Sequence, residues 1–189
     1  MTTTTKKKTV AKTTTESIKL QPNPFQHEIL ELVSNQRTNQ KKIEVLQEYR
    51  NDALVSILIW NFDESVFSAL PEGPVPYSSV QDQSSGNDTL SNSIEKQLEN
   101  PSKLDSHMAT QRTSLRQEAG IFYNFIRGGN SSISKLRIET MFINLLEGLH
   151  PKEAEILILT KDKQLQTKYK ITHQIVKDAY PDIQWGGRS

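Results

Sequence analysis

The chain has 189 residues, a formal net charge of +1 and a hydrophobic content of 34%. It contains no cysteine, which excludes disulfide scaffolds, thiolate metal sites, iron–sulfur clusters and cysteine nucleophiles. Its longest nearly apolar run, residues 53–60, is far shorter than the roughly 20 residues of a membrane-spanning helix. The Thr/Lys-rich start lacks the apolar stretch of a secretion signal. These features predict an intracellular protein without a membrane segment.

Aromatic residues are absent from two tracts, residues 1–22 and 78–112. We therefore predict a disordered basic arm (1–22), an N-terminal helical half (23–77), a flexible polar insert (78–112) and a C-terminal helical half (113–189), with the two halves packing as one domain. Residues 1–20 carry five lysines and one glutamate, a net charge of +4. This arm either meets an acidic partner or is a solvated tail.

Three helices are predicted in the first half, followed by a short helical turn over residues 64–70. Each begins at residues that suit a helix N-terminus: Asn23-Pro24, Thr38 or Asn39, and Asn51 or Asp52. The third helix is apolar nearly all round, so we expect it at the centre of the core. A buried strand is the alternative for that run.

The segment 71–77 contains three prolines in six residues and ends in an aromatic residue: Pro71, Pro74, Pro76 and Tyr77. Proline fixes the backbone dihedral φ, so a stiff, extended segment is predicted. It is either a polyproline-type strip that docks onto a protein partner or a rigid wrap over the core.

Residues 113–180 show the clearest helical periodicity. The start and stop signals, in chain order, are Thr113 or Ser114, Gly128-Gly129, Asn130 to Ser132, Gly148, His150-Pro151, Thr172 and Pro181. Almost no alternating strand pattern is present. The predicted fold class is therefore all-α, a small orthogonal bundle of about seven helices.

No constellation of catalytic residues is evident. The four histidines are His27, His107, His150 and His173, and none lies three or four residues from another, so no helical metal pair is predicted. No Walker-type phosphate loop is present. We predict no catalytic, cofactor-binding or metal-binding residue and no cofactor, and we expect that the protein is not an enzyme.

The C-terminal sequence Gly186-Gly187-Arg188-Ser189 combines glycine amides with a guanidinium, which suits a phosphate or a carboxylate. A mobile end is the alternative. Together with the proline-rich segment it gives the candidates for protein binding, which are Pro71, Pro74, Pro76, Tyr77, Trp185 and Arg188.

A basic cluster occupies residues 161–177, where a short turn precedes a capped helix as in a helix-turn-helix. The candidates for nucleic-acid binding are Lys161, Lys163, Lys168, Lys170, Gln174 and Lys177. The alternative is the solvated rim of a helical bundle.

Several segments resemble an uncharacterised protein family of T-even-like tailed phages, especially those that infect marine bacteria. They are LIWNFDES (58–65), LPEGPVPY (70–77), SLRQE (114–118), FIRGGN (125–130), FINLLEGLHP (142–151), KYKIT (168–172) and WGG (185–187). A second likeness, limited to residues 155–159 and 165–180, is to the small non-ATPase subunit of the T-even phage clamp loader, which is also small, helical and non-catalytic.

The resemblance implies a phage protein that acts in the cytoplasm of the infected cell. Combined with the residues above, it leads us to expect a non-enzymatic interaction or accessory protein with a phage or host protein partner. The alternative is a nucleic-acid-associated accessory factor of phage replication or transcription.

Overall fold

The computed structural model describes residues 20–77 and 113–188. In these residues the chain forms eight α-helices and one 3₁₀-helix, and no β-strand. They are α1 (Gln26–Asn35), α2 (Asn39–Glu48), α3 (Asp52–Phe62), α6 (Leu115–Glu118), η3 (Ala119–Phe125), α7 (Lys135–Gly148), α8 (Pro151–Lys161), α9 (Leu165–Lys168) and α10 (His173–Ala179). The predicted all-α class is confirmed. The arm up to residue 19 and the insert over 78–112 lie outside the described residues.

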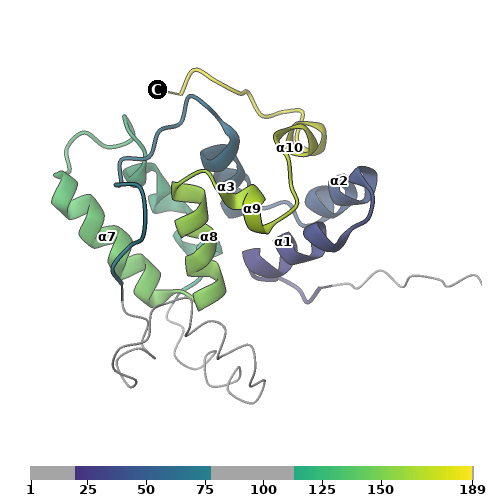
Figure 1. Cartoon of the computed structure of the whole chain (residues 1–189), viewed down its shortest axis with the longest axis horizontal. Helices are drawn as coiled ribbons and strands as arrows, with labels where there is room; N and C mark the ends of the chain where they lie inside the picture. The colour runs from purple at the N-terminus through teal and green to yellow at the C-terminus, as the bar shows by residue number, and fades with distance from the viewer. Residues whose placement is uncertain (1–19, 78–112, 189) are drawn as a thin grey trace, which may run out of the picture.

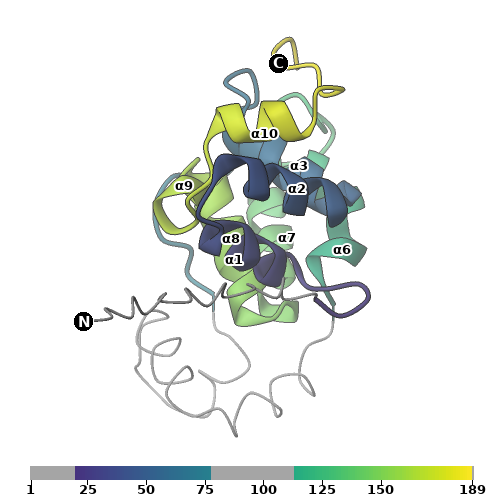
Figure 2. The ribbon, with the colours of Figure 1, turned by 90° about the vertical axis from the view of Figure 1, so that its right-hand side faces the viewer.

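The helices cross one another at steep angles around a central pair, α3 and α8 (Figure 1). Helix α7 packs on α8 at one side, and α1 joins α8 to α2 at the other. Figure 2 shows α10 lying across α2. None of the helices in the described part of the chain is long and apolar enough to cross a membrane.

One hydrophobic core is shared by the two halves. Helix α3 contributes Leu54, Ile57 and Leu58, and α8 contributes Ile156 and Leu157, all fully buried. The apolar run 53–60 is thus a core helix rather than a strand.

Four of the expected helix starts agree with the structure. The side chains of Thr38, Asn51 and Thr172 each accept a hydrogen bond from a backbone N–H in the first turn, and His150 Nδ1 accepts one from Lys152 N at 3.2 Å ahead of Pro151.

Four local expectations were wrong. Helix α1 begins at Gln26 with Phe25 at its N-cap position, rather than at Asn23-Pro24, because Asn23 has a positive φ of 59°. Residues 64–70 form turns and an extended loop, not a helical turn, because the carboxylate of Asp63 binds backbone and side-chain donors of the loop. The single helix expected between the start at Thr113 or Ser114 and the stop at Gly128-Gly129 is divided into α6 and η3. Helix α7 begins at Lys135, capped by Ser134 rather than by residues 130–132.

The buried carboxylate of Glu153 connects the two halves. Glu153 is fully buried, and its two oxygens accept hydrogen bonds from Gln26 N (2.9 Å) and Leu115 N (3.0 Å), the first residues of α1 and α6. The pKa of Glu153 is raised above its ordinary value, because the effect of burial outweighs the two backbone hydrogen bonds and the charge of Arg116, which act in the opposite direction. The carboxylate satisfies helix-start N–H groups that would otherwise lack partners.

Candidate functional site

The loop after α3 and the turn after η3 lie side by side and form the structural centre of the candidate site (Figure 1). Ser68 and Ile126 form an antiparallel bridge. Ala69 N donates to the Phe125 carbonyl and Arg127 N donates to the Phe67 carbonyl, both at 2.8 Å. The bridge fixes these two loops against each other, and each of two concavities is lined by one of its residues, Ser68 or Ile126.

The Gly128-Gly129 pair sets the geometry of the second loop. Gly128 has φ of +80°, which favours glycine. A Cβ atom at Gly129 would lie 1.8 Å from the Tyr123 carbonyl oxygen, so this close approach requires glycine. The pair was predicted as a helix stop. It also forms the turn that holds residues 125–127 in position to pair with the loop after α3.

The first concavity, which we call the apolar groove, has a volume of about 290 Å³. Two aromatic side chains define its character: Tyr123 is 50% exposed, while Trp60 is only 3% exposed. The buried Trp60 Nε1–H has no acceptor among the described residues. The groove is lined by Ser56, Ile59, Trp60, Val66, Ala119, Gly120, Phe122, Tyr123, Ile126 and Arg188.

The second concavity, which we call the basic pocket, has a volume of about 380 Å³. The Phe67 side chain, 50% exposed, lies in its wall beside the cations Arg127, Lys135 and Lys163. The remaining lining residues are Ser68, Ala69, Leu70, Pro71, Glu72, Lys161 and Asp162.

The proline-rich segment is attached to α8 through Lys161. The Lys161 ammonium is buried and donates to the carbonyls of Pro71 (2.8 Å) and Gly73 (3.0 Å) and to Asp162 Oδ1 (2.5 Å). Asp162 Oδ2 in turn accepts from Gly73 N at 3.3 Å. The segment therefore lies over the core as a wrap.

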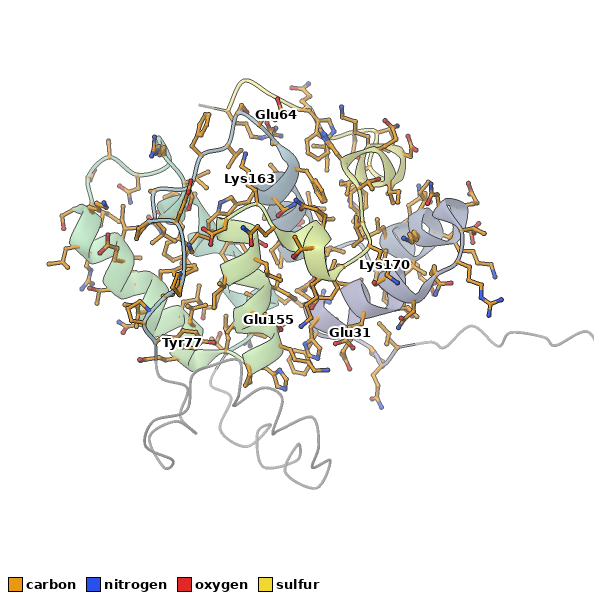
Figure 3. The ribbon with its side chains drawn as sticks, in the orientation of Figure 1. Glu31, Glu64, Tyr77, Glu155, Lys163 and Lys170 are labelled. Atoms are coloured by element: carbon orange, nitrogen blue, oxygen red, sulfur yellow. The ribbon has the colours of Figure 1, made fainter. Side chains whose placement is uncertain are left out.

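The rings of Pro71, Pro74 and Pro76 remain exposed, and Tyr77 is partly buried against the core. Figure 3 shows Tyr77 at the lower edge of the molecule and Glu64 at the upper edge. Of the four candidate residues in this segment, Pro71 alone is among the residues that line the basic pocket, and Tyr77 lines neither concavity.

The C-terminal tail binds a carboxylate of its own chain. Asp63, at the C-terminal end of α3, accepts hydrogen bonds from Gly186 N (3.0 Å), Arg188 Nη1 (2.6 Å) and Ser65 Oγ (2.7 Å). Burial disfavours the charged form of Asp63, but the bonds from Ser65, Gly186 and Arg188 outweigh it and lower its pKa to about 2. Gly186 and Arg188 therefore do bind a carboxylate, and that carboxylate is the Asp63 side chain of the same chain.

Trp185 anchors the same tail on α10. Its ring meets His173 edge-on, with centroids 4.4 Å apart, and His173 stacks on Phe62 at 5.9 Å. Burial and the nearby Lys177 lower the pKa of His173. Trp185 is therefore a packing residue between the tail and α10, and Arg188 is the predicted binding residue that reaches the apolar groove.

The lysines expected to form one basic surface point to different neighbours. Lys163 Nζ donates to the Asp63 carbonyl at 2.7 Å, and Lys168 forms an ion pair with Glu155. Lys170 is exposed, and its backbone N–H donates to Ser34 Oγ of α1 at 3.3 Å. Figure 3 shows Lys163 beside the loop after α3 and Lys170 near α1 and α2.

The two remaining candidates lie on α10. Lys177 is exposed, and Gln174 Nε2 donates to Asp178 Oδ1 at 2.7 Å. Of the predicted set, only Lys161 and Lys163 line the basic pocket, and Lys161 does so with a buried ammonium. The pocket's other cations, Arg127 and Lys135, were missed because they are far from the cluster in sequence.

Two other histidines form a stack within the fold. The His27 and His150 rings lie parallel at 4.9 Å, and Phe25 stacks on both. Burial, followed by the charges of His150 and Lys152, lowers the pKa of His27 to about 3. Among residues 20–77 and 113–188 no group of three or more histidine and carboxylate residues could hold a metal ion; His107 lies outside them.

The described part of the chain is a small all-α protein with an apolar groove beside a basic pocket. The chain belongs to DUF6433, a family of unknown function, whose model matches residues 29–103 and 97–167. The matched segments include α3, η3, α7 and the bridge between Ser68 and Ile126. Comparison with curated proteins and comparison with solved structures each gave no match.

Proposed function

We propose that this protein is a non-enzymatic interaction protein, and that the apolar groove receives a segment of a partner protein. The observation that carries the proposal is the groove itself, in which the half-exposed Tyr123 ring lies with the apolar side chains of Ile59 and Ile126. An exposed aromatic side chain in an apolar concavity is typical of a protein-binding site.

The lining of the groove specifies the chemistry of the partner segment. Ile59, Phe122 and Ile126 offer apolar surface, and a volume of about 290 Å³ accommodates one large apolar side chain. Burying such a side chain contributes about 1.5–3 kcal/mol. The half-exposed Tyr123 supplies the kind of aromatic contact that dominates many interfaces.

The Arg188 guanidinium adds a charge preference. It lines the groove, and Asp63 holds it in place through a 2.6 Å bond to Nη1. Because guanidinium has five donor hydrogens, a carboxylate from a partner can be bound there as well. We therefore expect a partner segment with a large apolar residue close to an aspartate or glutamate.

The test uses a random peptide library displayed against the full chain, followed by affinity measurements on the enriched peptides. The key variant is Gly120→Leu, which fills the groove. A Cβ atom at Gly120 meets no atom within 4 Å, so the substitution introduces no clash at Cβ, and thermal unfolding of the variant checks that it is folded. We expect enrichment of apolar-acidic sequences and at least a tenfold weaker affinity, about 1.4 kcal/mol, for the Gly120→Leu variant.

Two controls accompany this test. Gly120→Ala adds only a methyl group and should retain binding. Leu136→Ser removes another exposed apolar side chain, 73% exposed on α7 and outside the groove, and should also retain binding. Peptides that bind Gly120→Leu as tightly as the unmodified protein would refute the groove as the binding site.

The setting of this interaction is also proposed. Because segments 58–65, 114–118 and 142–151 resemble a T-even-like phage family, we place the protein in the cytoplasm of a phage-infected bacterial cell, without a cofactor. Quantitative mass spectrometry of infected cells, compared with purified particles, tests this. Detection in infected cells is expected, and its absence throughout infection would contradict the placement.

A further inference from the structure

We propose that the basic pocket binds one nucleotide unit of a single-stranded nucleic acid, with its phosphate on Arg127, Lys135 and Lys163 and its base on the Phe67 ring. The juxtaposition of three cations with a half-exposed aromatic ring in one pocket carries this inference. It goes beyond the protein-binding function and does not depend on the apolar groove.

The cations of the pocket are available to a ligand. Within the described residues the Arg127 guanidinium makes no hydrogen bond or ion pair. In the same part of the chain, the one ion-pair contact of Lys135 is with Glu139, at 4.0 Å. Lys163 Nζ donates to one carbonyl, that of Asp63, and an ammonium has three donor hydrogens.

The acidic residues of the pocket do not cancel this charge. Asp162 is neutralised by the buried ammonium of Lys161 at 2.5 Å. Glu72 is the other carboxylate in the lining. With four cations and two carboxylates around it, the pocket carries a formal charge of +2, which favours an anion.

The Phe67 ring provides the second half of the site. It is 50% exposed, and Lys163 Nζ lies 5.7 Å from its centroid. Its backbone is fixed, because the Phe67 carbonyl accepts the bond from Arg127 N at 2.8 Å. A half-exposed ring on a fixed backbone, in one pocket with a free guanidinium, matches a nucleotide, whose planar base adjoins a single negative charge.

Two properties favour a strand over an acidic peptide. A volume of about 380 Å³ takes one nucleotide, and a single stacked base contributes only modest affinity, so useful binding requires a chain that extends beyond the pocket. An acidic peptide would use the cations but would leave the Phe67 ring exposed. Binding of an acidic peptide is therefore an alternative outcome, which the experiment distinguishes from binding of a nucleic-acid strand.

The experiment measures fluorescence anisotropy of a labelled oligothymidylate of about 12 nucleotides with the full chain, from about 50 mM to about 200 mM salt. The variants are Arg127→Ala and Phe67→Leu, with Lys177→Ala and Leu136→Ala as controls. Lys177 is an exposed lysine of the predicted basic cluster outside the pocket, and Leu136 is an exposed apolar residue outside it. Because residues 1–20 carry a net charge of +4, differences between variants are decisive rather than the absolute affinity.

The two pocket variants should give different signatures. Arg127→Ala should weaken binding and reduce the slope of log affinity against log salt concentration by about 0.7, the value for one phosphate contact on a single strand. Phe67→Leu should weaken binding about five- to a hundredfold and leave that slope unchanged, because stacking involves no counterion release. Both controls should behave like the unmodified protein.

Three results would overturn the proposal. The first is absence of binding at about 50 mM salt. The second is a loss for Lys177→Ala equal to that for Arg127→Ala, which would assign binding to the 161–177 cluster. The third is displacement of the oligonucleotide by polyglutamate with an unchanged affinity of Phe67→Leu, which would identify a general acidic-polymer site. Since Gly120→Leu leaves the basic pocket intact, the two proposals can fail separately.

Discussion

Lys161 was a candidate for nucleic-acid binding because it is a lysine in a basic run, but its buried position gives it a structural role. A lysine in a basic run is usually solvated, yet this ammonium is buried and contacts two carbonyl oxygens and a carboxylate. Those acceptors belong to the proline-rich segment and to the end of α8. The side chain therefore holds the wrap that forms one wall of the basic pocket.

Replacing Lys161 by methionine should destabilise the protein by about 2–4 kcal/mol, because the Pro71 and Gly73 carbonyls and Asp162 lose their donor. Urea unfolding measures the loss. Hydrogen exchange at the Gly73 amide, bonded to Asp162 at 3.3 Å, should also accelerate. Lys177→Met, at an exposed position, should change stability by no more than about 0.5 kcal/mol. Equal effects of the two variants would show that Lys161 is not a structural residue.

Asp63 gives a prediction about pH. Its pKa is about 2 in the folded protein against an ordinary value of 3.8, because the bonds from Ser65, Gly186 and Arg188 outweigh burial. A carboxylate with a lowered pKa contributes stability that is complete above its unfolded value and disappears as the pH falls through the folded value. The unmodified protein should therefore lose about 2 kcal/mol from this group between about pH 5 and pH 2.

The measurement is urea unfolding across that pH range for the unmodified protein and for Asp63→Asn, which lacks the titrating group. Between about pH 5 and pH 2, the free energy of unfolding of the variant should fall by about 2 kcal/mol less than that of the unmodified protein. Asp178→Asn, at an exposed carboxylate on α10, should keep the steeper profile. An unchanged acid profile in Asp63→Asn would mean that the tail clasp does not hold in solution.

At the scale of single elements, the turn after η3 depends on one glycine. Gly129→Ala would place a Cβ atom 1.8 Å from the Tyr123 carbonyl, so the backbone must move. We expect a cost of about 2–4 kcal/mol. Gly120→Ala is the matched control, since its Cβ meets nothing within 4 Å and should be neutral or stabilising by about 0.4–1 kcal/mol. Thermal unfolding of the pair decides the point; a neutral Gly129→Ala would contradict the close approach.

The elements that the sequence predicted best are those with local signals. Thr38, Asn51 and Thr172 cap helices within a few residues of themselves, and the apolar run after Asn51 allows little but a buried helix. The predictions for 64–70 and 114–126 were wrong because distant partners decide those backbones. Asp63 is held by residues 186 and 188, and residues 67–69 pair with 125–127.

The candidate site was harder to predict from the sequence than the helices, because it too depends on contacts between residues that are distant in the chain. Arg188 was singled out, but the groove that it lines is formed by α3 and η3, and no sequence spacing relates these elements. Arg127 and Lys135 join Lys163 only because the bridge brings residues 67 and 127 together. The run 161–177 was predicted as a binding surface because it contains many lysines, but in the structure these lysines contact different parts of the molecule.

At the scale of the whole molecule, the two halves are not independent. The core contains residues from both, and contacts between α3 and α8, α1 and α8, and α2 and α10 cross from one half to the other. The bridge between Ser68 and Ile126 crosses between the halves as well. Both concavities are therefore products of the joined halves, and their integrity depends on the contacts that hold the halves together.

Glu153 is the most direct test of that joining, because its carboxylate accepts from α1 in one half and from α6 in the other. Glu153→Gln leaves one acceptor oxygen and turns an amide NH₂ toward a backbone N–H, so we expect a loss of about 2–3 kcal/mol. Unfolding followed by far-ultraviolet circular dichroism and by tryptophan fluorescence should shift together, because a shared core unfolds cooperatively. Glu155→Gln on the same helix removes only a partly exposed ion pair with Lys168 and should cost no more than about 1 kcal/mol. Two separate transitions in Glu153→Gln, or equal costs for the two variants, would show that the halves are stabilised independently of this carboxylate.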